Sequence, residues 1–236
     1  MPLKEAIPTW SPNGKKIAYQ NDALNGPSSQ QIFIMNADGS NKRQLTNLTA
    51  NTVYPDWSPD GKKIVFEVRT STTTFPADIA IINVDGSGYV KLTNAIATEA
   101  SGAWTTASYG DPTFSPDGTK IAFQHRLGND NSINLMNADG SNSYAITNVG
   151  NAYAEPSSNR AYRNSPAWSP DGTKIVYRSQ NYILGGTGIN TIDVKTGVET
   201  VVRHVSTESY YYPSWSPDGS KILFHSHRTG FFQIYA

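Results

Sequence analysis

One motif, Pro-x-(Trp or Phe)-Ser-Pro-(Asp or Asn)-Gly, occurs five times in this chain of 236 residues. The copies are 47, 57, 54 and 47 residues apart, measured between the second prolines Pro12, Pro59, Pro116, Pro170 and Pro217. An internal period of about 40–50 residues is typical of proteins built from repeated units, such as solenoids and propellers. The repeat therefore predicts an array of similar units within one domain.

Each copy of the motif has the chemistry of a tight turn between two strands. In the second copy, Pro59 presets the backbone for the first turn position, Asp60 can hydrogen-bond to its own backbone, and Gly61 can take the positive φ that other residues resist. Ile64 and Phe66 then share one face of the strand that leaves the turn, in the period of two that indicates a β-strand. The motif therefore predicts a β-hairpin.

Two further strands follow each of the first four hairpins, and one follows the fifth. In the first repeat they are residues 31–35 and 42–46, on either side of a second Asp-Gly turn at residues 38–39, and the later repeats keep this order. Four antiparallel strands, named a to d in chain order, make one blade of a β-propeller, and a ring of blades removes most exposed sheet edges. The sequence thus predicts an all-β, five-bladed β-propeller of four-stranded antiparallel blades.

The repeat also divides the chain into blades. We assign one propeller domain to residues 1–236, with blades at about 7–53, 54–110, 111–164, 165–211 and 212–236. The fifth repeat lacks a strand d, so the last blade is predicted to be incomplete or to be closed by the N-terminus, through residues 1–6. There are two alternatives. The chain could be a truncated part of a longer propeller, or an open apolar edge at residues 232–235 could pair with another copy of the chain. The motif aromatics are expected to be wedges between blades: Trp10, Trp57, Phe114, Trp168 and Trp215.

The repeated sequence resembles that of a known family. Over essentially the whole chain, the repeat is similar to the WD-like repeat of the TolB propeller family. It reads Pro-x-Trp-Ser-Pro-Asp-Gly-x-x-Ile-x-Phe, followed by Ile-x-x-Met-Asn-Ala-Asp-Gly-Ser-Asn and Leu-Thr. The resemblance implies a periplasmic or secreted interaction module. Some relatives with this repeat are polysaccharide lyases with a histidine-held metal ion, and others are non-catalytic propellers joined to a hydrolase domain.

Composition argues against several other classes of protein. Nineteen basic and nineteen acidic residues cancel, without the basic stripe of a nucleic-acid-binding protein. No run approaches the roughly 18 apolar residues of a membrane span, and the first residues lack the apolar segment of a signal peptide. The lack of cysteine excludes disulfides and thiolate metal sites. We therefore expect no cofactor, no nucleic-acid partner and no membrane insertion.

The two faces of the predicted propeller differ in sequence. The a–b and c–d connections are short, nearly identical turns, whereas the b–c and d–a connections vary in length and content. Variable loops on a rigid scaffold are where binding commonly takes place, and aromatic and arginine side chains can stack on sugars or hold peptide side chains. The predicted binding residues are Tyr54, Arg69, Trp104, Tyr109, Arg126, Tyr153, Tyr162, Arg178, Tyr210, Tyr211, Tyr212, His225 and His227.

The predicted function is a non-enzymatic scaffold that recognises a protein, peptide or glycan through the b–c and d–a connections. The alternative is a metal-assisted polysaccharide lyase that uses loop histidines, with Arg126 or Arg178 neutralising substrate charge. We assign no catalytic residue and no metal site, because His125 and His225 occupy different columns of the repeat. A structural or engineered repeat array without a dedicated ligand is the third alternative.

Overall fold

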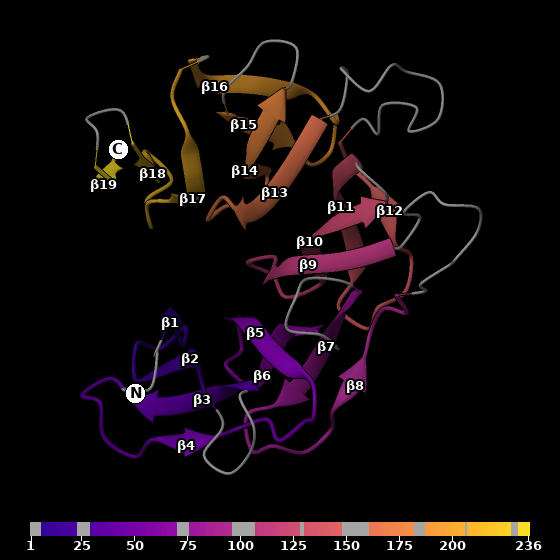
Figure 1. Cartoon of the computed structure of the whole chain (residues 1–236), viewed down its shortest axis with the longest axis vertical. Coiled ribbons are helices and arrows are strands. Elements are labelled where there is room, and N and C mark those ends of the chain that lie inside the picture. Colours follow the sequence, from indigo (N-terminus) through magenta and orange to yellow (C-terminus); the bar gives the residue numbers. More distant parts are fainter. Residues whose placement is uncertain are drawn as a thin grey trace.

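In a computed structural model, the chain forms five antiparallel sheets arranged in a ring (Figure 1). Four sheets have four strands and the last has three, which confirms the predicted five-bladed propeller. The structure describes residues 6–22, 29–69, 76–95, 107–127, 130–147, 161–181, 187–205, 207–227 and 231–236. Among these residues, none forms a helix long and apolar enough to span a lipid bilayer.

Within each blade, the strands lie side by side in chain order. Blade 1 consists of β1 (Ala6–Trp10), β2 (Lys16–Asp22), β3 (Gln30–Asn36) and β4 (Arg43–Gln44). Blade 2 consists of β5 (Asn51–Trp57), β6 (Lys63–Arg69), β7 (Ala77–Asn83) and β8 (Val90–Lys91). Blade 3 consists of β9 (Ala107–Phe114), β10 (Lys120–Leu127), β11 (Asp130–Asn137) and β12 (Tyr144–Ala145). Blade 4 consists of β13 (Ala161–Trp168), β14 (Lys174–Asn181), β15 (Thr187–Asp193) and β16 (Glu199–Val205), and blade 5 of β17 (Tyr210–Trp215), β18 (Ile222–Ser226) and β19 (Gln233–Tyr235). The first strand of each blade begins before the boundary drawn from the Pro-x-Trp motif.

The repeated Ser-Pro-Asp-Gly segment forms the turn between strands a and b by a local hydrogen-bond network. The Ser58 hydroxyl donates to Asp60 Oδ1 (2.6 Å) and accepts from the Lys63 backbone N–H (2.9 Å). Asp60 Oδ1 also accepts from the Lys62 N–H (3.0 Å), and Gly61 has the positive φ of 69° that the turn requires. Because these contacts span only a few residues, the motif can form the same turn in every blade.

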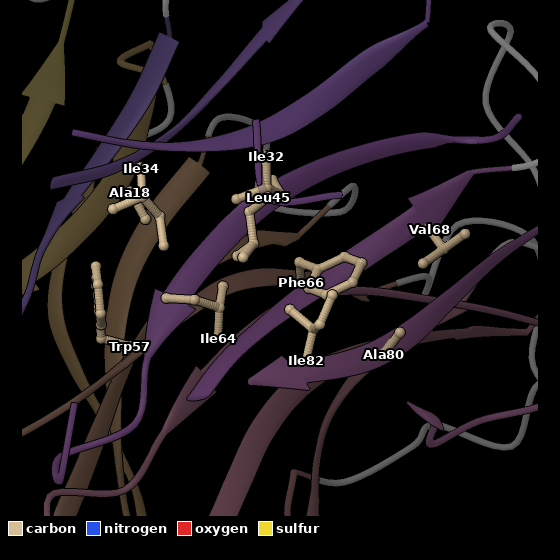
Figure 2. Packing of buried hydrophobic residues seen from close by; sticks show 10 residues of the cluster. All are labelled: Ala18, Ile32, Ile34, Leu45, Trp57, Ile64, Phe66, Val68, Ala80 and Ile82. Atoms are coloured by element: carbon tan, nitrogen blue, oxygen red, sulfur yellow. The ribbon is translucent and has the colours of Figure 1, made fainter. Parts of the chain in front are cut away.

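The hydrophobic core consists of layers between neighbouring blades. Ile64 and Phe66 in β6 face blade 1, where they pack with Ile34 and Leu45 (Figure 2). Val65, between them in sequence, packs on the other side of the sheet against blade 3. All three β6 side chains are fully buried, so the period-two alternation distributes apolar side chains between two cores rather than between a core and solvent. Each such side chain contributes roughly 1.5–3 kcal/mol by burial.

The motif aromatics of blades 2 to 5 are wedges in these layers, as predicted. Trp57 is 5% exposed, and its Nε1–H donates to the Thr9 carbonyl oxygen of blade 1 (3.2 Å). Trp168 makes the equivalent bond to the Thr113 carbonyl (3.3 Å). The wedge therefore joins neighbouring blades by apolar contact and by one hydrogen bond.

The prediction that Trp10 is a fifth wedge is wrong. Its side chain is 58% exposed, because the apolar clusters among the described residues join blades 1 to 2, 2 to 3, 3 to 4 and 4 to 5, but not 5 to 1. In blade 5, Phe231, Phe232 and Ile234 are also exposed, and no described strand pairs with the outer edge of β19. Of the segment expected to close the ring, residues 1–5 lie outside the described residues, and Ala6 pairs within blade 1.

Strand a of every blade is the innermost (Figure 1). It is bulged at its X-Pro step, where the pairing with strand b shifts in register. The residue before the proline has a positive φ, which is uncommon for residues other than glycine. A bulge redirects a side chain out of the regular alternation of a strand. In this propeller it places one residue of each blade beside the axis: Ile7 (φ 50°), Tyr54 (54°), Asp111 (49°), Ser165 (51°) and Tyr212 (49°).

Candidate binding pocket

A pocket of about 310 Å³ lies on the face formed by the b–c and d–a connections. Its walls come from the part of strand a before the X-Pro proline in blades 2 to 5 and from the second half of strand b in blades 2 to 4. These are the parts of the blades next to those connections. The lining residues are Tyr54, Glu67, Arg69, Ser108, Tyr109, Gly110, Asp111, Gln124, Arg126, Tyr162, Asn164, Ser165, Arg178, Tyr211 and Tyr212.

A second cavity of about 330 Å³ continues along the axis. It is lined by strand a of all five blades, including the five prolines of the X-Pro steps. The two cavities share four of the residues with positive φ: Tyr54, Asp111, Ser165 and Tyr212. These bulged residues therefore form the boundary between the pocket and the axial cavity.

The structure brings most of the predicted binding residues into this one pocket. They lie in four different blades, up to 158 positions apart from Tyr54 to Tyr212 in the sequence, and meet because each stands at the same end of its blade. The predicted residues that line the pocket are Tyr54, Arg69, Tyr109, Arg126, Tyr162, Arg178, Tyr211 and Tyr212.

Tyr210 is placed differently from the prediction. It is fully buried and packs edge-on against Phe224, with ring centroids 5.5 Å apart. Its hydroxyl donates to Glu208 Oε2 (2.5 Å) and accepts from Arg203 Nε (2.9 Å). Because strand a alternates its side chains, Tyr210 enters the core between blades 4 and 5, and Tyr211 faces the pocket instead.

Two of the remaining predicted residues, His225 and His227, do not line the pocket. His225 and His227 are exposed, although His225 lies near the pocket residue Tyr212, with ring centroids 6.1 Å apart. Trp104 and Tyr153 lie outside the described residues. No three His, Asp or Glu side chains in the described ranges are close enough together to hold a metal ion, which is the arrangement that a histidine-based metal centre requires.

Two carboxyl groups in the pocket are absent from the predicted set. Glu67 is 4% exposed, and burial raises its pKa to about 7, although the ion pair with Arg69 Nε (2.5 Å) acts in the opposite direction. Burial likewise raises the pKa of Asp111, which accepts hydrogen bonds from the Ser165 backbone N–H (3.0 Å) and hydroxyl (3.3 Å). For Glu67, the sequence did contain a signal that could have identified it as a pocket residue, because the residues at the ends of the b strands differ between repeats. For Asp111, the only signal was its position before the proline of the repeated motif.

Arginine side chains in the pocket lie over tyrosine rings. The Arg69 guanidinium carbon is 5.2 Å from the centre of the Tyr54 ring, and that of Arg178 is 4.7 Å from the centre of the Tyr211 ring. Arg178 Nε also donates to the Tyr210 carbonyl oxygen (2.8 Å). Cation–π contacts and such hydrogen bonds hold the guanidinium planes in fixed orientations.

Burial, together with the nearby Asp111 and Tyr212, raises the pKa of Tyr54, so its hydroxyl stays protonated at neutral pH. Tyr109 stacks on His125, with ring centroids 4.9 Å apart and an angle of 11° between the planes. One face of the Tyr54, Tyr109 and Tyr211 rings is therefore already covered by a neighbouring side chain. The pocket can offer hydroxyl groups, guanidinium groups and carboxyl groups to a ligand in a fixed geometry.

Comparison with solved structures identifies the fold. The chain superposes on TolB from Acinetobacter baumannii with a TM-score of 0.69 at 20% sequence identity, over 98% of this chain and 54% of that protein. A putative TolB from Agrobacterium tumefaciens matches with a TM-score of 0.61 at 19% identity, over 100% of this chain and 92% of that one. The chain has the TolB-like β-propeller fold. No protein-family model matches its sequence, and no curated protein matches it either.

The TolB-like fold also occurs in enzymes. A puromycin-hydrolysing peptidase from Mycobacterium tuberculosis matches with a TM-score of 0.68 at 17% identity, over 99% of this chain and 37% of the peptidase. This chain thus spans about half of the length of the A. baumannii TolB and little more than a third of the peptidase. At such identities the likeness describes the fold alone, which TolB shares with a part of this peptidase.

Proposed function

We propose that this protein is a non-enzymatic recognition module that binds a peptide segment of a partner protein in the pocket on the b–c and d–a face. The observation that carries the proposal is the convergence of tyrosine and arginine side chains from four blades on one cavity. Such side chains are those that most often contribute strongly to protein recognition. The scaffold beneath them is rigid, so little ordering is needed on binding.

The polar groups of the pocket support a peptide ligand. The pocket contains both acceptors, such as Glu67, and donors, such as Arg178. A peptide backbone needs both kinds of group along its length.

The cellular setting and oligomeric state are part of the proposal. A periplasmic or secreted location is supported by the resemblance of the repeat to that of TolB. Self-association through blade 5 is supported by the exposed side chains of Phe231, Phe232 and Ile234 beside the outer strand β19.

A peptide-display screen tests the proposed function. We expect the wild-type protein to retain a set of peptides that the variants Tyr109→Ala and Tyr211→Ala retain poorly. Tyr144→Ala is a matched control, because Tyr144 is an exposed tyrosine in β12, outside the pocket. Equal retention by all four proteins, or retention of oligosaccharides alone in a parallel glycan array, would contradict the proposal.

A further inference from the structure

We infer that the pocket is specific for a carboxylate of its peptide ligand, which Arg126 and Arg178 bind. This inference rests on the proposed function and adds the chemical class of the group that is recognised. It concerns two residues from adjacent blades, Arg126 in β10 and Arg178 in β14.

The first argument is the balance of charge in the pocket. Three guanidinium groups and two carboxyl groups line it: Arg69, Arg126 and Arg178 with Glu67 and Asp111. The formal sum, 3 − 2, is +1 when both acids are ionised, and it is higher when either acid is protonated. A concave site with positive charge and restricted solvent attracts anions.

The second argument is the geometry of the arginines. Arg69 pairs with Glu67 through Nε. Arg126 and Arg178 line the same pocket from the two following blades. Arg178 is held by its Nε bond to the Tyr210 carbonyl and by the ring of Tyr211 beneath it. A guanidinium group has five N–H donors in a planar fork that matches the two oxygens of a carboxylate. A fixed Arg178 is therefore suited to a planar anion.

The third argument is that Glu67, an acid of the pocket, can become neutral by taking up a proton. Glu67 is buried against Arg69 of its own strand and against Gly110 and Asp111 of β9. Its pKa of about 7 means that it takes up a proton near neutral pH at little cost. An incoming carboxylate favours this uptake, because the proton removes like-charge repulsion. The ligand itself stays ionised above about pH 5.

This coupling gives the proposal a characteristic pH dependence. As the pH falls from 8 to 6, Glu67 becomes protonated, the pocket becomes more positive, and a carboxylate ligand binds more tightly. A ligand without a charge gains nothing from the same change. The Glu67→Gln side chain is neutral at every pH, so the affinity of this variant should change less over this range than that of the wild type.

The test uses small probes and the folded full-length chain. N-acetyl-glycyl-tyrosine offers a C-terminal carboxylate, N-acetyl-aspartyl-tyrosinamide offers a side-chain carboxylate, and N-acetyl-glycyl-tyrosinamide offers neither. Binding is measured by NMR titration at pH 6 and pH 8. We expect at least one acid to bind at least about tenfold more tightly than the neutral amide, which corresponds to about 1.4 kcal/mol, and the better of the two acids identifies the source of the carboxylate.

Arginine variants complete the test. Arg126→Gln and Arg178→Gln should each weaken binding of the acid about tenfold, whereas Arg43→Gln, in the outer strand β4, should not change it. Arg178→Lys keeps the positive charge but lacks the planar pair of guanidinium N–H donors. A melting curve for each variant shows whether it is folded.

Equal affinity for the acids and the amide, or failure of all three probes to bind, overturns the carboxylate inference. An equal loss of affinity for the acid in Arg43→Gln and Arg178→Gln also overturns it. The proposed function stands apart from these outcomes, since it fails only if the pocket tyrosine variants leave peptide retention unchanged in the display screen.

Discussion

The carboxylate of Glu67 in β6 lies directly against Gly110 in β9, so that a Cβ atom at position 110 would come within 2.7 Å of Glu67 Oε2. The next backbone N–H, that of Asp111, points to the same oxygen at 3.4 Å. This contact joins blades 2 and 3 inside the pocket and fixes the position of a buried acid. It depends on the absence of a side chain at residue 110.

We therefore predict that Gly110→Ala displaces Glu67 and destabilises the fold by about 1–3 kcal/mol, because the Glu67 carboxylate is buried and paired with Arg69. Urea denaturation measures the loss. In a Glu67→Ala background, the same substitution should cost much less, because the atoms that clash are gone. An equal cost in both backgrounds would show that Glu67 is not the group displaced.

The raised pKa of Glu67 predicts how stability depends on pH. Between about pH 4.5 and 7 the folded state holds a proton that the unfolded state has lost, so this group lowers the free energy of unfolding as the pH rises through that window. The full effect is about 3 kcal/mol for a shift from 4.5 to about 7. Asp56 and Asp111, whose pKa values are also raised by burial, act in the same direction.

Denaturation curves at pH 5, 6, 7 and 8 measure this effect. The Glu67→Gln variant should show a shallower decline than the wild type, with the part due to Asp56 and Asp111 remaining. Above pH 8 the contribution of Glu67 to the wild type should no longer change. A decline that is as steep in the variant as in the wild type would assign the dependence to other residues.

The tryptophan wedges allow a matched comparison. Trp57→Ala removes a side chain that is 5% exposed and should cost about 3–5 kcal/mol, whereas Trp10→Ala removes one that is 58% exposed and should cost less than about 1 kcal/mol. Trp57→Phe removes the hydrogen bond to the Thr9 carbonyl, worth about 1 kcal/mol, together with part of the buried ring, so its cost should lie between about 1 kcal/mol and that of Trp57→Ala. Similar losses for the two alanine variants would mean that Trp10 is packed between blades in solution.

The exposed residues of blade 5 predict the association behaviour of the chain. The double variant Phe232→Ser/Ile234→Ser should keep the thermal midpoint of the wild type, because both side chains are more than half exposed. Its apparent mass in light scattering should be lower at high protein concentration, because an apolar strand edge favours association. An unchanged mass with an unchanged midpoint would remove the basis for self-association through β19.

The sequence predicted which side of the propeller holds the pocket, but not all of its residues. Tyr109, Arg126 and Arg178 were found from the variability of the strand ends. Tyr210 and Tyr211 could not be told apart from the sequence, because a one-residue shift in a strand reverses which side chain enters the core. The bulge before Pro213 changes that register, and its position becomes clear only in the folded blade.

By itself, the sequence determined the blades: the turn around Asp60 is closed by contacts within a few residues, and each copy of the motif carries the same local chemistry. Tertiary structure decided the rest, because the decisive contacts are long in range. Glu67 meets Asp111 from 44 positions away, and the burial that raises its pKa exists only when blades 2 and 3 pack together. Trp10 has the same motif as Trp57, yet it is exposed because a wedge needs a neighbouring blade to enter.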